Sequence, residues 1–175
     1  MTVSTQKPAH VVEIFLQPGE IYFGDRDTRI RTLLGSCVAV VMWHPKLLIG
    51  GMCHYMLPGR PGGKCEQLDG RYADEAMALM VREIGNAGTQ PGDYQVKLFG
   101  GGHMFSAQKR VGKDHIGAKN VEMARLLVQQ HGFEICSEHM GGVGHRNIFF
   151  DIWNGHVWVR HQPPETVGNN EICAQ

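Results

Sequence analysis

The fold is decided by residues 32–56, TLLGSCVAVVMWHPKLLIGGMCHYM, in which two apolar runs flank a short polar break, HPKL, at 44–47. Short apolar runs rich in Val and Ile are typical of strands, and Pro45 suits the second position of a type I turn because its ring fixes φ at about −65°. We therefore expect a β-hairpin with a four-residue loop over 44–47. A loop that is symmetric about its two central residues places Cys37 directly opposite His54.

A thiol facing an imidazole points to nucleophilic catalysis. Directly opposed residues of an antiparallel pair have Cβ atoms about 4.5–5.5 Å apart, so the side chains can meet and form an ion pair, and thiolate is the reactive form of cysteine. We predict Cys37 as nucleophile and His54 as its base. The small residues Gly35 and Ser36 let a substrate approach the backbone, and we expect the N–H of Cys37 to donate to an oxyanion. A bulge at the glycines of 50–51 would instead turn His54 to the other face.

A lone cysteine in an apolar strand is more often a core residue than a catalyst, so the catalytic interpretation of Cys37 rests on its pairing with His54. Cys53, which alternates away from His54, and Cys136 are predicted to be structural thiols. The 5 cysteines are an odd number without CxxC spacing, which favours free thiols over disulfides or a zinc site. The 10 histidines are scattered and form no HExxH motif, so we predict no metal.

Composition narrows the class of protein. A chain of 175 residues falls in the single-domain range, and its 17 Lys plus Arg balance 17 Asp plus Glu. This balance provides no basic surface for nucleic acid or for an anionic membrane. The first ten residues lack the apolar core of a signal peptide, and no apolar run is long enough to span a membrane. We therefore expect a cytoplasmic protein, monomeric, whose partners are proteins or small molecules.

Strands outnumber helices along the chain and do not alternate regularly with them. This pattern predicts an α+β fold, a single layered domain of mixed, mostly antiparallel β-sheet flanked by two main helices. Asn154-Gly155 between two apolar runs predicts a hairpin whose turn has two positive φ angles. One helix carries an apolar stripe from Ala73 to Ile84 and stops at Gly85 and Gly88, and a second runs from about Gly117 to His131. Strands are expected at 11–16, 20–23, 37–43, 48–56, 95–99, 133–138, 147–153 and 156–161.

The chain resembles the CheD family of chemoreceptor glutamine deamidases over about Gly19 to Arg160. The motifs that carry the resemblance are Thr32-Leu33-Leu34-Gly35-Ser36-Cys37, His54-Tyr55-Met56-Leu57-Pro58, Tyr72-Ala73-Asp74, Gly100-Gly101-Gly102-His103-Met104-Phe105, Ile116-Gly117-Ala118-Lys119-Asn120-Val121-Glu122 and Gly141-Gly142. A CheD-like domain is therefore expected over 11–162, between a disordered segment at 1–10 and a flexible tail at 163–175. We expect residues 103–105 to shape a substrate groove or a protein interface.

The resemblance implies hydrolysis of glutamine side chains on methyl-accepting chemotaxis proteins to glutamate, through a cysteine thioester and with release of ammonia. In some members it also implies hydrolysis of receptor glutamate methyl esters. It places the nucleophile at Cys37, the general base at His54 and a threonine that orients the histidine at Thr32, with no cofactor. Two alternatives stay open: a regulatory module that binds a CheC-type phosphatase or chemoreceptors without catalysis, and a cysteine hydrolase acting on another amide.

Overall fold

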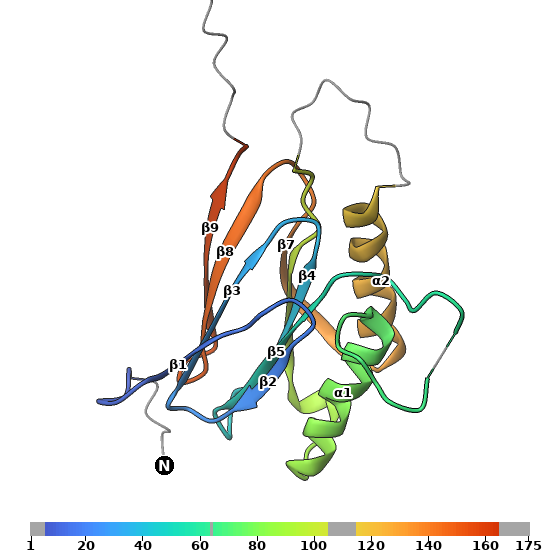
Figure 1. Ribbon diagram of the computed structural model, residues 1–175. Coiled ribbons are helices and arrows are strands. Elements are labelled where there is room, and N and C mark those ends of the chain that lie inside the picture. The colour runs from blue at the N-terminus through green and yellow to red at the C-terminus, as the bar shows by residue number, and fades with distance from the viewer. Residues whose placement is uncertain (1–5, 64, 105–114, 165–175) are drawn as a thin grey trace, which may run out of the picture.

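The computed structural model describes residues 6–63, 65–104 and 115–164 (Figure 1). Residues 1–5 of the predicted N-terminal segment, Phe105 and residues 165–175 of the predicted tail lie outside the described residues. The elements are β1 (Val12–Phe15), β2 (Ile21–Gly24), β3 (Thr28–Leu34), β4 (Val38–His44), β5 (Ile49–Tyr55), α1 (Ala73–Asn86), a 3-10 turn η1 (Pro91–Asp93), β6 (Gln95–Gly100), α2 (Ile116–Gln130), β7 (Glu134–Met140), β8 (His145–Asp151) and β9 (His156–Gln162).

The strands form two sheets. One has the order β1-β3-β8-β9 and the other β2-β5-β4-β6-β7, with most neighbours antiparallel and the β1–β3 and β6–β7 pairs parallel. Helices α1 and α2 cover one face of the five-stranded sheet, and the four-stranded sheet packs on its other face (Figure 1). The predicted α+β class is confirmed, and both helices lie on the same side of the layered domain.

Strand β4 is buried along its whole length because it is the middle strand of the central layer. Its alternate side chains therefore enter two different cores. Val38, Val40 and Met42 pack under the helices, whereas Ala39 and Val41 pack between the two sheets. A strand buried on both faces reads as a continuous apolar run, which is the pattern seen in the sequence at 38–43.

Every predicted strand is present, and β3 is an additional strand that is not among the predicted ones. The arginines at 29 and 31 conceal a strict alternation in which Thr28, Ile30, Thr32 and Leu34 are buried and the arginines are not. Both predicted helices are confirmed. Helix α1 continues through Gly85 to Asn86, and α2 is followed by a glycine with φ of 78° at the predicted position 132. Within the described parts of the chain, neither helix is long and apolar enough to cross a bilayer.

The β4–β5 hairpin is confirmed, but its predicted register is wrong. The loop covers 45–48 rather than 44–47, so the residue opposite His54 is Ala39 and not Cys37. The loop shifts because Leu48 takes a left-handed conformation, with φ of 51°, and its N–H donates to the carbonyl of His44 at 2.9 Å. The register moves by two residues, which leaves His54 on the predicted face.

The β8–β9 hairpin is also confirmed, with a different turn. Asp151 pairs with His156 across a four-residue loop, and the N–H of Gly155 donates to the carbonyl of Asp151 at 2.8 Å. Gly155 has a positive φ of 73°, whereas the only non-glycine residue with positive φ in the described chain is Leu48. The predicted turn with two positive φ angles is therefore wrong.

Candidate active site

Cys37, His54 and Thr32 come from three different strands or strand ends. Cys37 directly precedes β4, His54 lies in β5, and Thr32 lies in β3 of the other sheet. His54 pairs with Ala39, which faces the four-stranded sheet, and opposed residues share a face. Cys37, two residues before Ala39, packs against the same core and is half-buried. The site thus lies between the two sheets, with Cys37 in a diagonal register to His54.

A hydrogen bond from Thr32, in the four-stranded sheet, fixes the imidazole of His54. The Thr32 hydroxyl donates to the carbonyl of Leu16 at 2.7 Å, and its oxygen lies 2.7 Å from Nδ1 of His54. A carbonyl can only accept, so the single hydroxyl proton of Thr32 is used and its oxygen is left as an acceptor. The proton on the ring is therefore on Nδ1, and the lone pair is on Nε2. Thr32 is fully buried and His54 is 1% exposed, so water does not compete for these bonds.

Nε2 of His54 is buried and has no hydrogen-bond partner among the described residues. The thiol of Cys37 therefore makes no hydrogen bond to Nε2 in this structure. In a regular antiparallel ladder, diagonal neighbours are about 7–8 Å apart, within reach of a side-chain rotation, and catalytic hydrogen bonds often tighten only when substrate binds. An unpaired buried acceptor costs free energy, and such atoms in native proteins call for an explanation, of which a catalytic role is one.

Burial sets the protonation of both groups. It raises the pKa of the Cys37 thiol above its ordinary value, with a smaller opposing effect from the backbone N–H of Cys37. It also lowers the pKa of His54 to about 4. Both changes favour the uncharged form, because a charge loses solvation when it is buried. The structure therefore favours a neutral thiol and a neutral imidazole at pH 7 over the ion pair that opposed side chains could form.

Three consecutive carbonyls hold the turn that carries Cys37. The carbonyl of Gly35 accepts from the N–H of Gly102 at 2.8 Å, and that of Cys37 accepts from the N–H of Gly101 at 2.8 Å. The carbonyl between them, of Ser36, accepts from the side-chain amide of Asn120 in α2 at 3.0 Å. The glycines of the 100–102 segment are required here, since a Cβ on residue 100 would overlap the carbonyl of Cys37.

Two methionines lie close to this turn. Met104 approaches Gly35, where an added Cβ would lie 3.0 Å from the methionine sulfur, and it is 40% exposed. Met56, two residues after His54, is 37% exposed. Flexible, polarizable methionines adapt to partner surfaces. The predicted groove or interface role of residues 103–105 is untested and stays a prediction.

The other cysteines are separate from this site. Cys53 is fully buried in the core beneath the helices, on the face opposite to His54 as predicted. Cys136, also predicted to be a structural thiol, is exposed rather than buried in a core. Cys37, Cys53, Cys65 and Cys136 are all free thiols. Over the ranges the structure describes, no group of three or more His, Cys, Asp or Glu side chains is placed to hold a metal.

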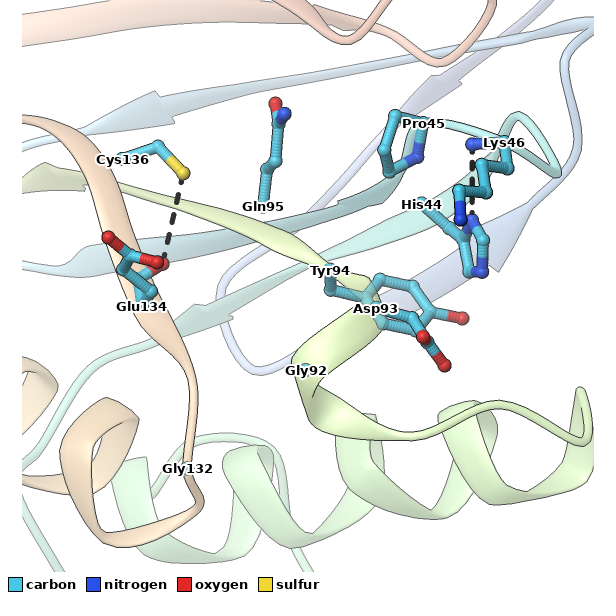
Figure 2. A pocket seen from close by; sticks show the side chains of 10 residues that line it. All are labelled: His44, Pro45, Lys46, Gly92, Asp93, Tyr94, Gln95, Gly132, Glu134 and Cys136. Atoms are coloured by element: carbon cyan, nitrogen blue, oxygen red, sulfur yellow. Dashed lines mark hydrogen bonds between the residues drawn. The ribbon is translucent and has the colours of Figure 1, made fainter.

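A cavity of about 500 Å³ lies at the far end of the central strands (Figure 2). It adjoins His44 at the end of β4, roughly 23 Å along the strand from Cys37 at about 3.3 Å per residue. Nδ1 of His44 accepts from the N–H groups of Lys46 and Leu47, so this histidine stabilises the hairpin loop. Cys136 lies across β6 from His44, which keeps the two side chains apart. The cavity therefore lacks a thiol–imidazole pair.

Comparison with known proteins identifies the family. The family model for CheD chemotactic sensory transduction matches residues 56–161. The chain belongs to the CheD family. A relative from Pseudomonas savastanoi pv. phaseolicola is 53% identical over 91% of this chain and 90% of its own, and one from Pseudomonas fluorescens is 51% identical over 90% and 89%. Both are named probable chemoreceptor glutamine deamidase CheD. The predicted CheD resemblance is confirmed.

The CheD family model begins after His54 and so does not cover the 32–54 segment. The alignments with the two relatives do extend into this segment, because they cover 91% and 90% of the chain and leave fewer residues unaligned than the segment contains. Among solved structures, the hypothetical protein YfiH of Bacillus licheniformis is similar with a TM-score of 0.43 and 17% identity, over 67% of this chain and 49% of its own.

Two contributors to the site are not predicted from the sequence. The carbonyl of Leu16 fixes the direction of the Thr32 hydroxyl, and a backbone acceptor leaves no mark on residue type. Asn120 was noted only as part of a motif. A polar residue in line with Ala124 and Leu127, four and seven positions before them on the inner side of an amphipathic helix, is a signal that could have found it.

Proposed function

We propose that this CheD-family chain hydrolyses glutamine side-chain amides of chemoreceptor cytoplasmic helices, with Cys37 as nucleophile, His54 as base and Thr32 as the residue that orients the base. The observation that carries this proposal is the bonded pair Thr32–His54, which leaves a buried Nε2 lone pair on the face that Cys37 shares. The names of the relatives supply the substrate class.

The first step is general-base attack on the amide. Nε2 of His54 removes the proton of the Cys37 thiol as sulfur bonds to the side-chain carbon of the glutamine. The C=O π electrons move to oxygen, and the tetrahedral oxyanion then collapses with cleavage of the C–N bond. His54 gives its proton to the leaving nitrogen, which departs as ammonia. Since both resting groups are neutral, the charge separation occurs during attack and the hydrogen bond to Thr32 stabilises the imidazolium.

The second step repeats the chemistry with water. His54 removes a proton from water as its oxygen adds to the thioester, and the C–S bond breaks with return of the proton to sulfur. The glutamine has become glutamate and the enzyme is regenerated without a cofactor. Because the product carries a new negative charge on a helix surface, hydrolysis alters charge pairing between neighbouring receptor helices.

The oxyanion needs hydrogen-bond donors in both steps. Loss of one such donor typically costs about 10²- to 10³-fold in rate. We assign one donor to the N–H of Cys37, with Gly35 and Ser36 forming the turn that exposes it. Met56 and Met104 offer exposed apolar surface beside the turn on which a receptor helix can pack.

Mass spectrometry of a purified chemoreceptor cytoplasmic fragment tests the proposal. Incubation with the wild-type protein should add about one mass unit at specific glutamines, because an amide becomes an acid, and Cys37→Ala should add none. Cys53→Ala is the matched control, since it removes a buried thiol from the same hairpin and should retain activity. Failure of the wild-type protein to modify any receptor that it binds would favour a binding module for receptors or a CheC-type phosphatase.

A further inference from the structure

Asn120 joins the nucleophile turn to the end of the strand that carries the base. It lies in α2 and is fully buried. Its side-chain Nδ2 donates to the carbonyl of Ser36 at 3.0 Å and to the carbonyl of Met56 at 2.8 Å. Ser36 directly precedes Cys37, and Met56 lies two residues after His54. One amide group thus spans the two chain segments that carry the proposed catalytic pair.

The bond to Ser36 controls the direction of a neighbouring donor. The carbonyl of Ser36 and the N–H of Cys37 belong to one planar peptide unit, in which a trans bond points them in opposite directions. A hydrogen bond that holds the carbonyl toward α2 therefore turns the N–H of Cys37 away from α2. The helix lies on the far side of the five-stranded sheet from the four-stranded sheet, so the N–H is turned away from the helix layer.

Asparagine is the residue type that this position needs. Both of its contacts are carbonyl oxygens, which only accept, so both must be served by the two hydrogens of Nδ2. The remaining oxygen, Oδ1, is buried and has no hydrogen-bond partner within the described chain. A buried amide with one unsatisfied atom costs folding free energy. The two hydrogen bonds donated by Nδ2 are what an amide provides at this position in return. Aspartate, of the same shape, would direct a carboxylate oxygen at two carbonyls.

We propose that Asn120 is a positioning residue that fixes the Ser36–Cys37 peptide so that the Cys37 N–H serves as an oxyanion donor. This inference rests on the proposed function of Cys37 as an acyl-transfer nucleophile. The flanking carbonyls of Gly35 and Cys37 are held by backbone N–H groups. Asn120 is the side chain that holds the carbonyl between them, so substitution can release this one peptide.

Two reagents separate this role from a general effect on the thiol. Iodoacetamide alkylates Cys37 by direct displacement at carbon and forms no oxyanion, whereas p-nitrophenyl acetate acylates it through a tetrahedral oxyanion. We expect Asn120→Ala, which adds no charge beside the thiol, to be alkylated at Cys37 within about twofold of the wild-type rate and acetylated about 10²-fold more slowly. Peptide mass spectrometry assigns both products to Cys37, and Cys37→Ala supplies the background.

Val128→Ala is the matched control because it removes buried core packing from the same helix without touching the turn. Its ratio of acetylation to alkylation should equal that of the wild type. Equal loss of both reactions in the Asn120 variants, or unchanged acetylation, would overturn the proposal. Should Asn120→Ala fail to fold by circular dichroism, Asn120→Ser, which is also uncharged and keeps one donor, decides the outcome. The two proposals can fail separately. If acetylation and alkylation respond to the Asn120 substitutions as expected but the wild-type protein deamidates no receptor, the proposed function is refuted and the positioning role of Asn120 stands.

Discussion

Replacement of Thr32 by valine should slow glutamine hydrolysis while preserving the shape of the core. The side chain is fully buried, and its hydroxyl bonds both Nδ1 of His54 and the carbonyl of Leu16. Valine fills nearly the same volume but offers neither donor nor acceptor. The ring of His54 would then lose the bond that selects its tautomer and that stabilises its charged form in the transition state.

The size of the effect follows from the two bonds. A buried polar group left without its partner costs about 1–3 kcal/mol, and each 1.36 kcal/mol is about tenfold in rate. If the loss at Nδ1 of His54 falls on the transition state, kcat/KM should drop between about fivefold and about 150-fold. The orphaned carbonyl of Leu16 lowers folding stability by a similar free energy, which for a chain of this size is a decrease in Tm of about 2–4 °C per kcal/mol.

The assay is the initial rate of mass gain at receptor glutamines, with thermal unfolding followed in parallel. Thr32→Ser is the matched control because it keeps the hydroxyl and loses only a methyl group, so its kcat/KM should stay within about threefold of wild type. The reasoning is refuted if Thr32→Val retains full activity, or if Thr32→Ser is as slow as Thr32→Val while both remain folded.

Three further predictions concern charge and packing at the site. Burial lowers the pKa of His54 from 6.5 in the unfolded chain to about 4. Its contribution to the free energy of unfolding is therefore complete above pH 6.5 and falls by on the order of 3 kcal/mol as the pH approaches 4. Urea unfolding at pH values between 6.5 and 4 should show a weaker dependence of this free energy on pH for His54→Gln than for the wild type. Alkylation of Cys37 by iodoacetamide should rise continuously from pH 6 to 9, because burial raises the pKa of this thiol, and a rate plateau below pH 7 would instead reveal an ion pair. Gly100→Ala should lower kcat/KM by at least about tenfold and lower Tm, since its Cβ would displace the carbonyl of Cys37 and its φ of 111° is strained for alanine; Gly59→Ala, where nothing lies within 4 Å, should change neither.

The sheet face on which His54 lies could be predicted from the hairpin, but the residue opposite it on the neighbouring strand could not. Pro45 correctly indicates a turn, and the alternation of β5 places His54 and Cys53 on opposite faces. The loop position depends on Leu48, which adopts a left-handed conformation while its side chain is 1% exposed in the core. Burial of a leucine can offset local strain of this kind, and this balance is a tertiary effect with no local signal.

Thr32, the third side chain of the proposed catalytic set, illustrates a different limit. The resemblance alone predicts a role for Thr32, because the arginines at 29 and 31 conceal the strand in which it lies. The sequence nevertheless shows Thr28, Ile30 and Thr32 alternating with two arginines, and this period of two places Thr32 on the core face of a strand. The hydrogen bond between Thr32 and His54 joins side chains from the two sheets. A contact of this kind depends on the order of the strands in the fold, and the spacing of residues along the sequence does not reveal that order.

The most direct test is to quench the reaction of the wild-type protein with a glutamine-containing receptor peptide in acid and to map covalent adducts by mass spectrometry. A thioester should appear on Cys37, with a mass equal to protein plus peptide less about 17 mass units for the ammonia lost. The adduct should decay into the glutamate product and be absent from Cys37→Ala. Undiminished hydrolysis by Cys37→Ala, or an adduct confined to another cysteine during turnover, would contradict the assignment of Cys37 as nucleophile.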